Sequence, residues 1–475
     1  MSFETNQTTT TSQIQRRPGI FATIKAALSN ENQDFTKGSI RKGVILLAIP
    51  MILEMVMESV FALVDIYFVG HIEGKASQAV STVMLTESVL MIMYSAAIAL
   101  SMGATAIVAR RVGEKNIEAA SRSAAQGINL AVIVAAVVSL FGSIFASDVL
   151  RAMGGSHAVV EIGTPYTRIM FGGSVVIMLL FLINGVFRGA GNANIAMWTL
   201  LIANGCNIIL CPLLIHFFGL PGAAIATTTG RGIGVLFQLY HLFKGKSALL
   251  RIKKEYFKID WSIFKSLYSL SWVGFLQFFI ASASWIFLNR MVAAFGDDAV
   301  AGYGVALRVL MFFLLPAWGL SNAAATLVGQ NLGAGQPERA EKAVWTTALY
   351  NAVFMAIVSL ICLLFADHII YFMNSNEAMA VYGKKALHII SLGYIFYGVG
   401  MVVTNSFNGA GDTKTPTWIN LFGFWAFQIP FAYMLSVSMD FGPTGVFIAV
   451  VTAETLISIA GVLIFRRGKW KAVKI

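Results

Sequence analysis

The chain has 475 residues, of which 57% are apolar and only 12% are charged, whereas soluble domains have about 45–50% apolar and about 25% charged residues. This composition excludes an ordinary soluble protein and predicts an integral membrane protein. The net charge of +11 would suit a nucleic-acid-binding protein, but most of the 34 Lys and Arg residues fall in loops on one predicted side of the membrane, which argues against a nucleic-acid partner.

In chain order, residues 1–40 are rich in Thr, Gln, Ser and Asn and lack the apolar stretch and cleavage site of a secretory signal. We therefore expect a polar cytoplasmic tail there. Windows of about 20 apolar residues can cross a bilayer core, and the sequence contains twelve of them. The predicted fold is all-α, with transmembrane helices at 43–69, 78–108, 123–146, 162–186, 194–217, 221–243, 266–293, 299–328, 343–366, 386–408, 416–438 and 442–465.

The chain also contains an internal repeat. Residues 187–198 (FRGAGNANIAMW) match residues 407–418 (FNGAGDTKTPTW) 220 positions later, and 108–120 match 328–340 at the same offset. The Gly-Ala-Gly in each copy is predicted to form a tight cytoplasmic turn. In so apolar a chain, a duplicated half indicates a transporter. We expect two pseudo-symmetric six-helix lobes at 41–245 and 265–468, a cytoplasmic linker at 246–264 and a tail at 469–475.

The distribution of basic residues predicts the orientation in the membrane. With the N-terminus inside, the loops at residues 110–122, 244–265 and 466–474, and also Arg188, place their positive charge on the same side. By the positive-inside rule both termini are cytoplasmic. We therefore predict a multi-pass protein of the cytoplasmic (inner) membrane, embedded in the lipid bilayer.

Several function classes lack their motifs. The fragment Gly245-Lys246-Ser247 has Tyr240 where a phosphate-binding loop needs its first Gly, so ATP hydrolysis is not expected. The Gly-Ala-Gly turns are too short for a dinucleotide fingerprint. No catalytic set stands out, and the three Cys residues form no metal or disulfide pattern: Cys206, Cys211 and Cys362. We predict no enzyme activity, no cofactor and no metal other than a sodium ion at Asp65.

Ionisable residues inside membrane spans mark candidate functional sites, because they are costly there and usually face a cavity or a partner. Five acids lie in spans: Glu54, Glu58, Asp65, Glu87 and Glu454. At 100° per residue, the first three share one face of the first helix. Such a cluster takes up a proton or binds a cation. Asp65 is the main candidate, and a structural role stays open for the others.

Two further features have alternative interpretations. Arg231 in the first half aligns with Glu454 in the second, which suggests a charged contact across the pseudo-symmetry axis. Pro50 lies inside the first span and removes one backbone hydrogen bond. It is either a hinge that couples ion occupancy to bending or a static kink.

Together these features resemble the multidrug and toxic compound extrusion (MATE) transporters. The resemblance covers nearly everything from Ser39 to Trp470, and GAGDTKTP at 409–416 is its most specific segment. It implies two lobes around a central cleft, export of organic cations and other amphipathic compounds against a sodium or proton gradient, and a role for Asp65 as the ion-binding acid of the first lobe.

The chain departs from the family pattern at two places. Many prokaryotic members carry an Asn followed four residues later by an Asp in the fifth helix, whereas here Asn207 is followed by Cys211. Asn207, Thr227 and Thr228 are then neutral partners of Asp65, and Glu54 and Glu58 compensate. The seventh and tenth helices also lack the acids of some relatives, which leaves Gln277, Asn289 and Tyr397 as polar contacts.

The predicted function is a cation-coupled exporter that works by alternating access on small amphipathic or cationic molecules, as a monomer. Both H+ and Na+ stay open as the coupling ion, and the few neutral oxygens near the carboxylates favour H+. Aromatic and Met side chains between the lobes can repack around varied substrates. The candidate substrate contacts are Met57, Phe61, Gln277, Trp285, Tyr397 and Gln428.

Two alternative functions stay open. A flippase for a lipid-linked saccharide or peptidoglycan precursor would need a cationic cleft for pyrophosphate, and the intramembrane Arg residues do not obviously cluster in the sequence: Arg168, Arg231, Arg290 and Arg308. An intramembrane lipid-modifying enzyme would need a convergent set of catalytic groups that the spans do not display.

Overall fold

The protein is an all-helical bundle in the residues that its computed structural model describes, which are 20–29, 33–70, 72, 76–245, 249–373 and 376–475. The first half contains α1 (Ile20–Leu28), α2 (Ile40–Gly70), α3 (Ala76–Gly113), α4 (Ile117–Ile144), α5 (Ala146–Ala152), α6 (His157–Gly172), α7 (Ser174–Ala190), α8 (Ala193–Phe218) and α9 (Leu220–Phe243). A 3-10 turn, η1 (Lys254–Phe257), precedes the second half, which contains α10 (Trp261–Ala293), α11 (Asp297–Gly333), α12 (Pro337–Met373), α13 (Glu377–Ser391), α14 (Tyr394–Ala410), α15 (Lys414–Asn420), η2 (Leu421–Gln428), α16 (Ile429–Tyr433), η3 (Met434–Ser438), α17 (Pro443–Arg466) and η4 (Lys469–Ala472).

The membrane spans agree with the twelve that the hydropathy pattern predicts. In the described part of the chain, nine helices are long and apolar enough to cross a membrane, and two bent pairs pass the same test together. The remaining span is α9, which is 24 residues long and less apolar because it contains Arg231 and Gln238. The fourth predicted span of the chain corresponds to the pair α6 and α7, and the tenth to the pair α13 and α14.

The two bent pairs are a feature that the sequence did not indicate. Helices α6 and α7 meet at 40°, and α13 and α14 meet at 55°. The breaks lie at Gly173 and near Gly393, 220 positions apart. At Gly173 the side chain of Thr228 approaches so closely that a Cβ atom would lie 2.7 Å from it. Apolar character continues across both breaks, so hydropathy alone predicts unbroken spans.

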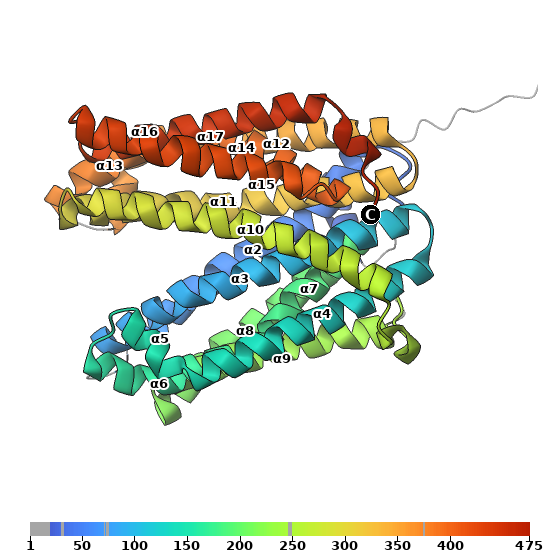
Figure 1. Ribbon diagram of the computed structural model, residues 1–475, viewed down its shortest axis with the longest axis horizontal. Helices are drawn as coiled ribbons and strands as arrows, with labels where there is room; N and C mark the ends of the chain where they lie inside the picture. The colour runs from blue at the N-terminus through green and yellow to red at the C-terminus, as the bar shows by residue number, and fades with distance from the viewer. Residues whose placement is uncertain (1–19, 30–32, 71, 73–75, 246–248, 374–375) are drawn as a thin grey trace, which may run out of the picture.

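The helices form two lobes, as predicted. Figure 1 shows α4 to α9 on one side and α12 to α17 on the other, with α2, α3, α10 and α11 between them. The lobes contact each other through α2 with α11 and through α3 with α10 and α11. They lie together at the end that carries the C-terminus and diverge toward the other end (Figure 1). We call the first end the closed end.

Close backbone contacts repeat between the halves. Gly189 packs on the carbonyl of Thr105, and Gly409 packs on that of Ala325, 220 positions later in both partners. Each contact is followed by a glycine with left-handed backbone, Gly191 (φ 85°) or Gly411 (φ 87°), which ends α7 or α14. The predicted Gly-Ala-Gly turns are therefore confirmed, and the absence of a side chain is required for both the contact and the turn.

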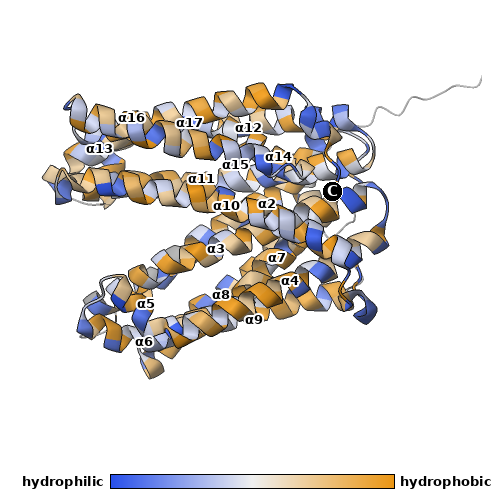
Figure 2. Ribbon diagram, in the orientation of Figure 1, coloured by the Kyte–Doolittle hydropathy of each residue, from blue (hydrophilic) through white to orange (hydrophobic). Residues whose placement is uncertain are grey.

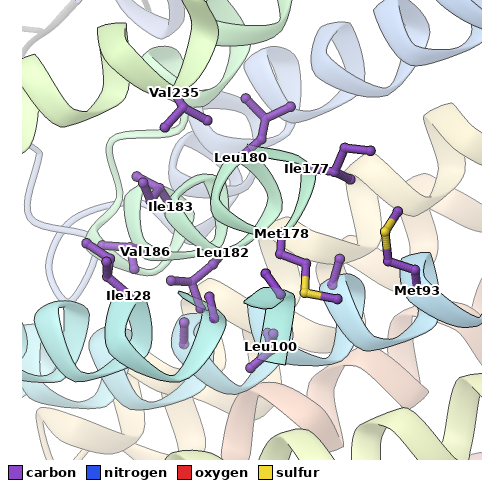
Figure 3. Packing of buried hydrophobic residues seen from close by; sticks show 14 of the residues in the cluster. Met93, Leu100, Ile128, Ile177, Met178, Leu180, Leu182, Ile183, Val186 and Val235 are labelled. Carbon is purple, nitrogen blue, oxygen red and sulfur yellow. The ribbon is translucent and has the colours of Figure 1, made fainter. Parts of the chain in front are cut away.

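The core of the first lobe surrounds α7. Figure 3 shows Leu182, Ile183 and Val186 of this helix among Ile128 of α4, Leu100 of α3 and Val235 of α9. The α7 residues are fully buried. This helix therefore has a fixed position against three neighbours, and its polar residues lie at fixed positions inside the lobe. Figure 2 shows that polar residues otherwise concentrate toward the helix ends.

The segments that were expected to be tails and linker pack against the helices where they are described. Phe35 joins a buried cluster with α2 and α11. In the linker, Leu250 and Tyr256 join the core of the first lobe. Near the C-terminus, Trp470 is 1% exposed and stacks on Phe465. Residues 1–19 and 246–248, on which part of the tail and linker predictions depend, lie outside the described residues.

Candidate functional site

The interior of the first lobe contains a buried ion pair between α2 and α7. Arg188 donates to Glu54 at 2.7 Å, and the two side chains are 10% and 1% exposed. Asn184 adds a second hydrogen bond to the same carboxylate oxygen, and Gln238 in turn donates to Asn184. Arg188 also donates to the Ser101 hydroxyl at 2.7 Å. Because its charge is compensated by Arg188, Glu54 has a structural partner in this conformation.

Arg188 was counted among the basic residues of the cytoplasmic side, but its side chain is buried in the lobe, where it pairs with Glu54. The residue is 8% exposed because it lies in the last turn of α7 on the face from which its side chain reaches Glu54 of α2. Polar residues at i and i+4 in an apolar span, here Asn184 and Arg188, are the sequence signal that could have revealed an inward-facing polar face.

A second ion pair joins α2 to α9. Arg231 lies 3.3 Å from Glu58, with side-chain exposures of 4% and 18%. The Arg231 guanidinium also lies over the ring of Phe61 at 4.9 Å and over that of Tyr94 at 5.9 Å. The predicted contact between Arg231 and Glu454 is wrong: α9 and α17 lie at opposite edges of the molecule (Figure 1), so Arg231 finds its acid within its own lobe.

Asp65 has no such ion pair among the described residues. It is 8% exposed, and its Oδ1 accepts a long hydrogen bond from the Cys211 thiol at 3.8 Å. Arg231 and Glu87 act on it only as longer-range charges. Of the three acids on α2, Asp65 is therefore the one whose charge no basic side chain compensates directly.

The neutral residues predicted around Asp65 are partly assembled. Asn207 donates to the Thr227 hydroxyl at 3.2 Å, and its own carbonyl oxygen is buried without a partner. Thr228 instead faces Gly173 at the break between α6 and α7, because neighbouring helix positions point about 100° apart. Thr227 and Asn207 thus lie on the side of Cys211, and Thr228 does not.

Pro50 lies within α2, which continues as one helix from Ile40 to Gly70. The proline is eight residues before Glu58 and fifteen before Asp65. The next residue, Met51, contacts Gly319 of α11 in the other lobe. The weak point of this helix therefore lies where the two lobes touch, between the closed end and the acids.

The predicted substrate contacts are spread over both lobes. Phe61 belongs to the cation–π contact of Arg231 inside the first lobe. Gln277 and Gln428 are buried in the second lobe, with amide atoms that have no hydrogen-bond partner. Two further residues, Trp285 and Tyr397, are partly buried against the core of that lobe. The carbonyl of Met57, the sixth candidate, accepts a hydrogen bond from Asn204.

Glu454 is the buried acid of the second lobe. It is 6% exposed, and its Oε1 has no hydrogen-bond partner. The hydroxyl of Tyr397 is close enough to act on the carboxylate. Among the described residues no Lys, Arg or His forms an ion pair with it, which distinguishes it from Glu54 and Glu58.

Hydrogen bonds between the lobes gather at the closed end. Gln330 of α11 donates to the carbonyl of Gly189 at 2.9 Å, and Thr326 donates to that of Arg188. Arg110 of α3 donates to the carbonyls of Ala410 and Val473. This end is therefore held by polar contacts from both lobes and from the C-terminal segment.

Comparison with known proteins identifies the family and the fold. The family described as MatE matches residues 50–213 and 275–434, one block in each lobe. The chain belongs to the MatE family. As a MATE transporter it is a membrane protein that moves small molecules and not an enzyme, so the alternative of an intramembrane lipid-modifying enzyme is wrong.

Relatives agree with this assignment over almost the whole chain. The chain is 27% identical to the probable multidrug resistance protein NorM of Thermotoga maritima over 440 residues, which cover 91% of this chain and 93% of the relative. It is 22% identical to the multidrug export protein MepA of Staphylococcus aureus over 432 residues, covering 90% and 94%.

Solved MATE structures have the same fold. A crystal structure of MATE in complex with MaL6 superposes with a TM-score of 0.85 at 26% identity, covering 91% of this chain and 97% of that one. An outward-facing conformation of a multidrug resistance MATE transporter of the MOP superfamily gives 0.87 at 26% identity, covering 93% and 98%. The predicted arrangement of twelve helices in two lobes is thus confirmed.

Proposed function

We propose that this MATE transporter is a proton-coupled antiporter that exports amphipathic or cationic organic compounds and works as a monomer. Asp65 is the coupling carboxylate. The observation that carries the proposal is the contrast on α2: Glu54 and Glu58 have Arg partners at 2.7 and 3.3 Å, whereas buried Asp65 has none within the described residues. A buried carboxylate without a counter-charge takes up a proton or a cation.

The groups around Asp65 favour a proton over sodium. A hard cation needs several oxygen ligands, and one of the groups that contact the Asp65 carboxylate is a thiol, that of Cys211 at 3.8 Å. A proton needs only the carboxylate itself. The amide N–H of Asn207 donates to the Thr227 hydroxyl, and the carbonyl oxygen of Asn207 is left without a partner. These two neutral oxygens are fewer than the set of ligands that a hard cation needs.

The positive charge at the closed end supports a cytoplasmic location of that end. Arg110 and Arg111 lie there with the basic residues that follow α17. The lobes then diverge toward the outside of the cell, a state that releases substrate. Protonation of Asp65 from the outside would start the return step, and bending of α2 at Pro50 would pass the change to the interface of the lobes at Met51 and Gly319.

Transport by the purified protein in liposomes tests the proposal. A fluorescent organic cation should move when a pH gradient is imposed in sodium-free buffer, and a sodium gradient at fixed pH should have no effect. The variant Asp65→Asn should reduce gradient-driven movement at least about tenfold, the change that about 1.4 kcal/mol produces. The variant Asp440→Asn, an exposed acid at a turn, is the matched control and should transport normally.

Three outcomes decide between the candidates. Normal pumping by Asp65→Asn would remove the coupling role of Asp65. Pumping that depends on sodium at fixed pH would replace H+ with Na+ as the coupling ion. Movement of a lipid-linked pyrophosphate without an effect on organic cations would favour the flippase alternative.

A further inference from the structure

A basic groove lies at the closed end, where the two lobes meet. It has a volume of about 520 Å³ and is formed where the first turn of α2 meets the first two turns of α12. The side chains used below are Arg41 of α2 and Arg339, Lys342 and Trp345 of α12. A second groove of about 430 Å³ shares Ile40, Arg339 and Lys342 with it. None of these residues belongs to the site around Asp65.

The cations of the groove have no acidic partners in the described part of the chain. Arg41, Arg339 and Lys342 form no ion pair there, and the two nearest acids on α12 share a single lysine. Lys471 bonds to Glu338 at 2.8 Å and to Glu341 at 2.6 Å. Four cationic side chains, those of Arg41, Arg339, Lys342 and Lys471, thus stand against two carboxylates, so the groove keeps a net positive charge.

Arg339 is held in a fixed position while it keeps its charge. Its guanidinium donates to the backbone oxygens of Gly38 at 2.9 Å and Lys37 at 2.8 Å, which orient it without neutralising it. Its Nε is buried and has no partner. A preorganised guanidinium of this kind suits the oxygens of a phosphate group.

The N-terminal ends of two helices add to the positive electrostatic potential of the basic side chains. Helix α2 begins at Ile40 and α12 begins at Pro337, and both ends line the grooves. The N–H groups in the first turn of a helix have no intrahelical acceptor and carry partial positive charge. Two such ends converge here on the same space as three cationic side chains.

The groove lies at the level expected for lipid headgroups. Trp345 lines it and is partly exposed. Its indole Nε1 donates to Glu341, and Arg466 lies 5.7 Å from its ring. Tryptophan concentrates at the membrane–water interface, and Figure 2 shows the change from apolar to polar colouring at this end of the helices.

We propose that this groove binds the phosphate of an anionic lipid headgroup. Its basic residues come from both lobes, so a bound lipid connects α2 with α12 and stabilises the closed end. The chemistry that is recognised is a phosphate with a negative charge, and the position beside the bilayer selects a lipid as its source. The proposal depends on the position of the groove at the membrane surface and not on the coupling role of Asp65.

Lipid binding to the full-length protein in nanodiscs tests the proposal. Discs would contain either phosphatidylcholine alone or a mixture with spin-labelled phosphatidylglycerol, and the fraction of motionally restricted label would be measured. Each basic residue near the surface contributes about 1 kcal/mol to binding an anionic lipid. The double variant Arg41→Gln/Lys342→Gln should therefore weaken binding by about tenfold or more. Arg339 is left in place because it holds the backbone of residues 37 and 38.

A matched control removes the same charge elsewhere. The double variant Lys265→Gln/Lys385→Gln changes two exposed lysines of α10 and α13 that do not line the groove and should bind the labelled lipid as the unmodified protein does. Equal binding by the groove variant and the unmodified protein would overturn the proposal. Binding of inorganic phosphate in detergent, without enrichment of phosphatidylglycerol in discs, would also overturn it and identify free phosphate as the ligand.

Discussion

The two lobes have the same backbone packing and opposite interior chemistry. Met51 of α2 contacts Gly319, and its counterpart Gly274 of α10, 223 positions later, contacts Ala99. With this offset of 223 residues between α2 and α10, the acid Asp65 corresponds to Leu288, which is 1% exposed. The repeat has therefore kept the close contacts of the backbone while the charged side chains differ.

The remaining pairs follow the same trend. The offset of 223 between α2 and α10 pairs Glu54 with Gln277. The offset of 220 between α7 and α14 pairs Arg188 with Asn408. A buried ion pair in the first lobe is thus replaced by two amides in the second. Close packing restricts which small residues can stand at a helix contact, whereas a buried charge is retained only where it has a partner or a task. The difference between the lobes therefore supports the proposal that the coupling ion binds in the first lobe.

The largest expected effect comes from breaking the ion pair of the first lobe. Arg188→Ala leaves the carboxylate of Glu54 buried without its cation, and we expect a loss of about 3–5 kcal/mol in the free energy of unfolding. The corresponding change in the second lobe, Asn408→Ala, removes an amide that has no hydrogen-bond partner and should cost about 1 kcal/mol or less. Unfolding of both variants in nanodiscs, followed by tryptophan fluorescence, measures the contrast. Equal losses in the free energy of unfolding would mean that the buried ion pair contributes no more to stability than the amide of the second lobe.

A smaller effect of opposite sign is expected at Glu454. Oε1 of this buried acid has no hydrogen-bond partner, and no basic residue in the described part of the chain pairs with it. Glu454→Gln should therefore be neutral or stabilise the protein by about 1–2 kcal/mol. Glu54→Gln is the control, since it leaves Arg188 uncompensated and should destabilise. If Glu454→Gln lowers stability as much as the control does, the second lobe has a partner for this acid in the working protein.

The smallest effect concerns a surface pair at the closed end. Burial alone would raise the pKa of the Asp34 carboxyl, but hydrogen bonds from Lys115 and Thr36 lower it from 3.8 to about 2. A lowered folded-state pKa adds stability above pH 3.8 that is lost as the pH falls through about 2. Side-chain exposures of 37% for Asp34 and 60% for Lys115 limit the gain to about 0–1 kcal/mol.

Denaturation of Asp34→Asn at several pH values measures this contribution. The variant should be slightly less stable than the unmodified protein at pH 7, and the two should become equal near pH 2. A difference that persists at pH 2 would show that Asp34 acts through packing instead of charge.

Much of the architecture follows from the sequence alone. Apolar windows of the right length predict the twelve spans, because a bilayer requires each crossing segment to satisfy its backbone hydrogen bonds internally. The repeated Gly-Ala-Gly predicts the turns at Gly191 and Gly411, because a left-handed residue at a helix end favours glycine. The resemblance to MATE transporters adds the two lobes and directs attention to Asp65.

The helix breaks at Gly173 and Gly393 and the partners of the buried charges were decided by the tertiary structure. A sequence shows that Glu54, Glu58 and Asp65 share a helix face, but whether each has a cation depends on which turn of α7 or α9 lies opposite. Arg188 and Arg231 come from positions more than a hundred residues away. Periodicity is a property of one helix, whereas charge compensation is a property of helices packed together, so only the packed lobe distinguishes the neutralised acids from the free one.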